Sequence, residues 1–135
     1  MTASSTGGLP PPIVVSRRDA ARLEALIESP RWQNDPTAEA LLGELTRADI
    51  VDDADMPADV VGMHSRVVCI DDHSGEHHEL TLVFPNEADS GAGRISVFAP
   101  VGSALLGLSV GQSIDWTTPQ GRALRLRVTG VTPAG

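Results

Sequence analysis

Residues 96–111 decide the fold, and they read Ser96-Val97-Phe98-Ala99-Pro100-Val101-Gly102-Ser103-Ala104-Leu105-Leu106-Gly107-Leu108-Ser109-Val110-Gly111. The run opens with a short apolar segment that can end a strand. Pro100 then suits the first turn of a helix, because its fixed φ fits a helix and its missing N–H costs nothing there. Gly107 is placed to close that helix in a left-handed conformation. The pattern predicts a strand, a short helix and another strand, folded into a buried corner whose Ala99-Pro100 edge faces a partner.

Length and composition limit the kinds of protein this can be. The chain has 135 residues, which suits one domain with an appendage or two very small units. Hydrophobic residues make up 41% and aromatic residues only 3%, so we expect a core of Val, Leu, Ile and Ala. The net charge is −8, and all 10 basic residues are arginines. We therefore expect no direct binding to nucleic acid, which needs clustered cations, and a protein partner is favoured.

Cys69 is the single cysteine, so no internal disulfide can form, and its apolar neighbours predict a buried structural thiol. No apolar span is long enough for a transmembrane helix, and the first residues do not have the pattern of a signal peptide. We therefore expect a cytoplasmic protein with no membrane partner.

The first third of the chain predicts two helices. Residues 1–12 are rich in Thr, Ser, Gly and Pro, which predicts a disordered tail. Apolar residues then recur at helical spacing over 17–28, with Ser16 as the N-cap and Asp19 as its partner in a capping box. A second apolar stripe runs from Ala38 to Ala48, with Asp35 as the N-cap of that helix.

Two short helices joined by a short turn can bury their apolar stripes on each other. Residues 13–50 therefore predict an antiparallel helical hairpin, with arms of about 12 residues and roughly 18 Å. Such a hairpin would be a stubby projection. Residues 51–62, rich in aspartate, predict an acidic linker. A divalent-cation loop is the alternative, but the spacing lacks the glycine and the distal glutamate of a calcium loop.

Beyond the linker the apolar period changes to that of strands. The predicted strands cover residues 65–71, 79–84, 94–98, 112–118 and 123–131. In the last strand Leu124 and Leu126 alternate with Arg125 and Arg127, which predicts one buried face and one positive stripe. The fold class is thus α+β: a helical hairpin followed by an antiparallel sheet with one short helix.

No catalytic constellation is visible in the sequence. Four histidines, His64, His73, His77 and His78, invite a metal hypothesis, but no pair has the spacing of a zinc enzyme. We therefore expect no metal, no cofactor and no enzymatic activity. Asp35 leaves two interpretations open. It is a helix cap with Glu39 as a favourable acid in the first turn, or it is a carboxylate at the hairpin tip that meets a metal or basic site in a partner.

Several stretches carry a resemblance to a known family, namely the corner at 96–111, Met56-Pro57-Ala58-Asp59-Val60-Val61, Met63-His64-Ser65-Arg66-Val67, Ile114-Asp115-Trp116 and Pro119-Gln120-Gly121. From about residue 13 to 131 the chain resembles the Rnk group of the GreA/GreB transcription factors. The resemblance implies an FKBP-like domain over 63–135 that docks on RNA polymerase at the rim of its secondary channel. It also implies a short N-terminal coiled coil that points toward the channel, and an effect on nucleoside diphosphate kinase levels.

Two positions depart from the Gre pattern. Gre factors have a Ser-Pro pair at the corner, where this chain has Ala99-Pro100. Their tip carries an Asp and a Glu three residues apart that help to hold the magnesium for transcript cleavage. Asp35 matches the first acid, but Ala38 stands in the place of the second, and Glu39 is displaced by one residue. The predicted arms are also much shorter than those of the cleavage factors.

The resemblance and these departures together predict a non-enzymatic regulator that binds RNA polymerase at the secondary channel rim, competes with Gre factors and has no cleavage activity. The predicted contacts are Phe98, Ala99, Pro100, Val101 and Gly102, with Asp35 and Glu39 at the hairpin tip. Two alternatives stay open: a Gre-like factor that stimulates transcript cleavage, and an FKBP-type peptidyl-prolyl isomerase, which the fold type alone suggests.

Overall fold

The computed structural model describes residues 13–117 and 120–133, and the predicted tail at 1–12 lies outside this range. The N-terminal part consists of β1 (Val14–Ser16), α1 (Arg17–Ile27), α2 (Pro36–Arg47) and β2 (Asp49–Val51). The rest forms β3 (Arg66–Asp71), β4 (His77–Val83), β5 (Arg94–Ser96), α3 (Pro100–Leu105), β6 (Ser113–Thr117) and β7 (Ala123–Thr132). Short 3-10 turns occupy Asp53–Asp55, Pro85–Glu87 and Ser90–Ala92. The predicted α+β class is confirmed.

Both long helices begin at the predicted caps. The Ser16 hydroxyl oxygen accepts a hydrogen bond from the Asp19 N–H at 3.2 Å, and the Asp35 carboxylate accepts one from the Ala38 N–H at 2.9 Å. The carboxylate of Asp19 accepts from the backbone N–H of Met63 at 3.0 Å, so it does not complete the predicted capping box. It ties α1 to the C-terminal part of the chain instead. No helix in the described residues is long and apolar enough to cross a membrane.

A short parallel pair of strands closes the N-terminal part. Val14 of β1 lies opposite Asp49 of β2, and Ser16 lies opposite Val51. Strands of three residues are too short to show a hydrophobic period, so the sequence does not predict them. The pairing brings the segment before α1 next to the segment after α2.

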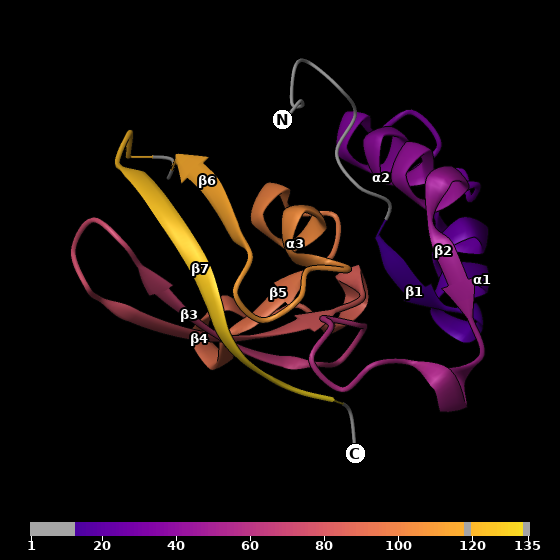
Figure 1. Ribbon diagram of the computed structural model, residues 1–135. Coiled ribbons are helices and arrows are strands. Elements are labelled where there is room, and N and C mark those ends of the chain that lie inside the picture. The colour runs from indigo at the N-terminus through magenta and orange to yellow at the C-terminus, as the bar shows by residue number, and fades with distance from the viewer. Residues whose placement is uncertain (1–12, 118–119, 134–135) are drawn as a thin grey trace, which may run out of the picture.

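The C-terminal part is a five-stranded sheet in the order β5-β4-β3-β7-β6, with α3 against it (Figure 1). The prediction of a wholly antiparallel sheet is wrong, because β5 runs parallel to β4, with Thr81 opposite Arg94 and Val83 opposite Ser96. The 3-10 turns between these strands lead the chain round so that it enters β5 in the direction of β4. The predicted turn at 118–121 lies partly outside the described residues.

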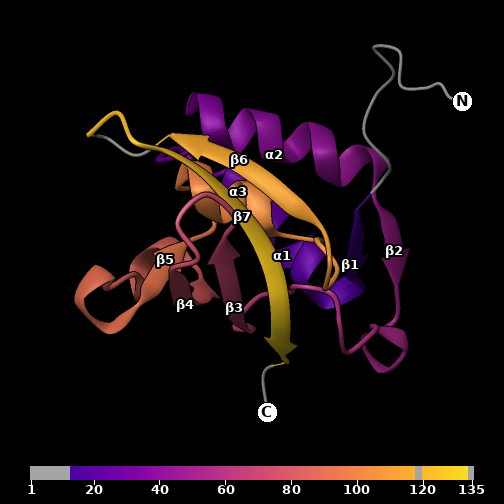
Figure 2. The same cartoon turned by 60° about the vertical axis from the view of Figure 1, so that its left-hand side comes forward.

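One hydrophobic cluster joins the helices to the sheet. It contains Leu23 of α1 and Leu41 of α2 together with Leu82 and Leu126 of the sheet, and each is no more than 2% exposed. Figure 2 shows α2 running alongside α3, and residues of α2, α3 and β6 line a common groove. The prediction of a projecting helix pair is therefore wrong, because the pair packs against α3 and the sheet. Helices of 11 and 12 residues gain little stability alone, so burying their stripes against the sheet is favoured.

Two further predictions concern buried residues. Cys69 is fully buried, as predicted, and burial raises the pKa of its thiol to about 11. The predicted linker is solvated only in its acidic half, because Val60 and Val61 are buried. The N–H of Val61 donates to the carbonyl of Leu108 at 2.8 Å, so the end of this segment packs with the corner.

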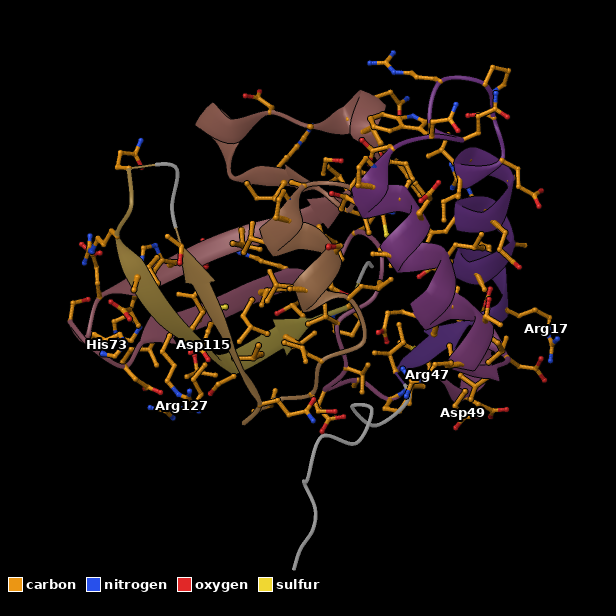
Figure 3. The ribbon with its side chains drawn as sticks, turned by 90° about the horizontal axis from the view of Figure 1, so that it is seen from above. Arg17, Arg47, Asp49, His73, Asp115 and Arg127 are labelled. Carbon is orange, nitrogen blue, oxygen red and sulfur yellow. The ribbon has the colours of Figure 1, made fainter. Side chains whose placement is uncertain are left out.

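The outer face of β7 is less positive than its sequence predicts. Leu124, Leu126 and Val128 are buried and the arginines between them are exposed, which confirms the alternation. However, Arg125 pairs with Asp115 at 3.2 Å and Arg127 pairs with Asp72 at 3.2 Å. Figure 3 shows Asp115 and Arg127 on the side of the sheet away from the helices. The expected positive stripe is therefore largely neutralised.

A buried carboxylate organises the turn between β3 and β4. Asp71 is fully buried and accepts hydrogen bonds from the Ser74 hydroxyl at 2.7 Å and from the Arg125 N–H at 3.1 Å. These bonds, the one from Ser74 above all, lower the pKa of Asp71 from 3.8 to about 2. The ionised carboxylate therefore links the turn to the neighbouring strand β7.

Candidate partner-binding surface

The corner predicted from residues 96–111 is present, but few of its residues are accessible. Pro100 begins α3 and is exposed, and Ala99 before it is half-buried. Phe98, Val101 and Gly102 are buried. Of the five predicted contact residues, Ala99 and Pro100 alone have side chains that a partner could touch. The other three shape the corner from beneath.

At Gly102, α3 packs closely against the end of β5. A Cβ at this position would collide with the carbonyl oxygen of Ser96, at the end of β5. A backbone atom cannot move aside as a flexible side chain can, so glycine is required here. At the other end of α3, Gly107 has the predicted left-handed backbone, with φ +83°, and a Cβ there would collide with Ile13.

The turn between the two helices meets the corner directly. Trp32 lies in this turn, and its ring packs edge-on against the Phe98 ring, with 4.7 Å between centroids and an interplanar angle of 60°. The structure thus places the turn between the helices against Phe98 of the corner. Trp32 is not among the site residues that the sequence predicts. The sequence feature that points to a contact for Trp32 is a large aromatic residue in a polar turn, in a chain with two Trp, two Phe and no Tyr.

The turn is ordered by its own backbone hydrogen bonds. The N–H of Trp32 donates to the carbonyl of Ser29 at 3.0 Å, and the N–H of Asp35 donates to the carbonyl of Trp32 at 3.0 Å. Arg31 is exposed, and its guanidinium carbon lies 5.3 Å from the centroid of the Trp32 ring. A cation therefore stands on an aromatic face beside the corner.

The acids at the predicted tip do not form a matched pair. Asp35 is half-buried and its carboxylate caps α2, which supports the simpler of its two interpretations. Glu39 is exposed in the first turn of α2. Ala38, where the resemblance places the second acid, has 0% exposure. A glutamate at this position would have to enter the core.

A second contact holds α1 against the sheet. The Arg22 guanidinium lies over the Phe84 ring, 4.4 Å from its centroid, and the His64 ring packs against the same ring at 5.6 Å. His64 Nε2 lies 2.8 Å from a Glu87 carboxylate oxygen, and that hydrogen bond lowers the pKa of Glu87. Both phenylalanines of the chain, Phe84 and Phe98, are thus used to hold the helical part in place.

A groove of ≈ 490 Å³ lies between α2, α3 and β6. Its described lining consists of aliphatic, small and polar residues, among them Leu41, Leu106, Leu108 and Ile114, and no aromatic residue belongs to it. Within residues 13–117 and 120–133, no three His, Cys, Asp or Glu side chains are grouped so that they could hold a metal ion.

Comparison with known protein families finds two matches along the chain. Residues 56–133 match the family described as "Transcription elongation factor, GreA/GreB, C-term", and residues 11–51 match "Rnk N-terminus". Among curated proteins, the chain is 44% identical over 118 residues to "Regulator of nucleoside diphosphate kinase" of Escherichia coli (strain K12), covering 87% of each chain. It is 35% identical over 78 residues to "Transcription elongation factor GreA" of Azorhizobium caulinodans, covering 58% of this chain and 50% of that one.

A solved structure has the same fold along its whole length. "Prokaryotic transcription elongation factor GreA/GreB from Nitrosomonas europaea" superimposes with a TM-score of 0.81 at 44% sequence identity. The match covers 92% of this chain and 100% of that chain. The similarity therefore includes the helical part as well as the sheet.

Proposed function

Because the chain belongs to the GreA/GreB family of transcription factors, with an Rnk-type N-terminal part, we propose that it is a non-enzymatic regulator that binds RNA polymerase. It docks at the rim of the secondary channel and competes there with Gre factors. In this proposal residues 63–135 serve as the FKBP-like docking domain and residues 13–50 as a short coiled-coil hairpin. The names of the relatives, regulator and elongation factor, support the class of function.

The docking contact is assigned to the Ala99-Pro100 edge of the corner. Pro100 is exposed at the start of α3, while Gly102 and Phe98 beneath it fix the path of the backbone. The edge is rigid, because α3 approaches the end of β5 so closely. A rigid edge loses little conformational entropy when it binds, and this favours docking.

The absence of cleavage activity rests on one observation, the complete burial of Ala38. Two carboxylates must converge on one site to share a metal ion with the enzyme that they serve. Here Asp35 is occupied as a helix cap, and the position of the second acid lies in the core. Glu39 is exposed but one residue away, on a different face of α2.

Binding to purified core polymerase tests the proposal. The wild type should be retained by immobilised core enzyme, and Pro100→Asp should be retained much less. Pro57→Asp is the matched control, because Pro57 is also exposed but lies in the acidic segment. Equal retention of the two variants would reject the assigned edge.

Competition and cleavage are measured in the same system. A GreA protein added in excess should displace the chain from core polymerase, and stalled elongation complexes should keep full-length RNA when the chain is added. Shortened RNA that is lost with Asp35→Ala would instead support the alternative of a cleavage factor. The comparisons give no support to the isomerase alternative.

A further inference from the structure

We propose that the turn between α1 and α2, residues 28–35, forms the second half of the polymerase-docking surface, and that Arg31 on this turn pairs with a carboxylate of the polymerase. The inference rests on the proposed function and gives the helix pair a role there. The turn does not reach into the channel. It lies beside the Ala99-Pro100 edge and binds the same surface of the partner.

Three contacts hold α1 and the turn that follows it in this position. The Trp32 ring packs on Phe98, the Arg22 guanidinium lies over Phe84, and the Asp19 carboxylate accepts from the N–H of Met63. They are distributed from the first turn of α1 to the turn that follows it. A helix held along its whole length in this way cannot swing out as a separate arm. The turn and the corner are therefore presented to a partner as one rigid surface.

The corner alone is too small to be a complete docking site. A stable protein–protein interface covers about 800 Å² on each partner and involves about 20–30 residues. The accessible part of the predicted set is two residues, Ala99 and Pro100. Trp32 contacts Phe98, and Pro100 is two residues further along the chain, within about 8 Å. A partner that covers Pro100 must therefore extend over neighbouring surface, and the turn is directly adjacent.

The side chains on the turn are of the type that dominates binding energy. Tryptophan and arginine are enriched among the few interface residues that contribute most to affinity. The chain has only two Trp and two Phe residues to fill its core. Trp32 is nevertheless only partly buried, so part of its side chain is accessible to a partner. The stacked guanidinium of Arg31 is held in a defined place, so that less entropy is lost when it pairs.

Charge indicates the chemistry of the partner. Arg17, Arg125 and Arg127 each pair with an aspartate of the chain. Arg31 has no carboxylate in ion-pair contact within the part of the chain that the structure describes, and its guanidinium lies over the Trp32 ring. In a protein of net charge −8, this leaves an accessible cation beside the docking edge. Its complement is an acidic side chain on the polymerase.

The test measures the affinity of fluorescently labelled full-length chain for core polymerase. Arg31→Glu should weaken binding by about fivefold at low salt, and the effect should shrink as salt is raised. Arg17→Glu carries the same charge change at the far end of α1, a helix about 16 Å long, and should stay close to the wild type. Trp32→Phe keeps an aromatic ring against Phe98 but reduces the contact area, and it should weaken binding by a smaller factor.

The outcomes separate the two proposals. If Pro100→Asp weakens binding while Arg31→Glu and Trp32→Phe bind like the wild type, the inference is overturned and the proposed function stands. If the wild type fails to bind core polymerase, both are overturned. If Arg31→Glu dissociates a self-associated form in sedimentation velocity and leaves polymerase binding unchanged, the surface serves a second copy of the chain and the inference is again overturned.

Discussion

Replacing Ala38 with glutamate tests whether the fold itself excludes the second acid of the cleavage pair. Ala38 is fully buried, and its N–H donates to the Asp35 carboxylate at 2.9 Å. A longer side chain at this position overpacks the core, which costs about 1–3 kcal/mol. The new carboxyl group must also become neutral in the core or stay charged without a partner, which adds about 1–3 kcal/mol.

The sum is a loss of about 2–6 kcal/mol in the free energy of unfolding, out of the 5–15 kcal/mol typical of a domain. Urea denaturation followed by far-UV circular dichroism measures this loss. Ala40→Glu is the matched control, because Ala40 is exposed on the same helix, and its effect should stay within about 0.5 kcal/mol. A loss below about 1 kcal/mol for Ala38→Glu would show that position 38 is open to solvent. Transcript cleavage by this variant would refute the reasoning as well.

Three further predictions concern the corner and the core. Gly102→Ala should destabilise the fold by about 1–3 kcal/mol, because the added Cβ collides with Ser96. Gly43→Ala, with open space around it in α2, should instead stabilise the fold by about 0.5–1 kcal/mol. Urea titration measures both free energies of unfolding, and equal effects would contradict the close approach at Gly102. Because the pKa of Asp71 is lowered to about 2, its contribution to stability is complete above its usual value of 3.8 and is lost as pH falls toward 2. The difference in urea midpoint between wild type and Asp71→Asn should therefore disappear over that range, and a constant difference would count against this assignment. Because burial raises the pKa of Cys69 to about 11, the folded protein should react with a thiol reagent far more slowly than the urea-unfolded chain, and equal rates would show that the thiol is accessible.

Local patterns in the sequence predicted the elements that depend on nearby residues. The caps at Ser16 and Asp35, the left-handed Gly107 and the alternation along β7 each follow from side chains within a few positions of one another. The buried corner and the buried Cys69 follow from apolar runs. These features could be predicted because the chemistry that determines them is short-range.

The features that were missed depend on contacts between distant segments. The pairing of β1 with β2 joins residues 14 and 49, and the parallel pairing of β4 with β5 depends on how the intervening turns lead the chain. Phe98, within the predicted contact set, is buried and packs against Trp32 from a distant segment. No spacing rule relates these two rings. Local sequence patterns therefore do not predict that the helix pair packs against α3 and the sheet.

The contact between Trp32 and Phe98 sets a limit on the length of the helices. β1 and β2 fix the base of the helix pair, and the two rings fix its other end at the height of the corner. Seven extra residues in each helix would carry the turn about 10 Å beyond Phe98 and leave that ring without its cover. The length of the helices thus decides where their turn lies. At this length the turn packs against Phe98, whereas the turn of a longer helix pair would extend past the corner into solvent.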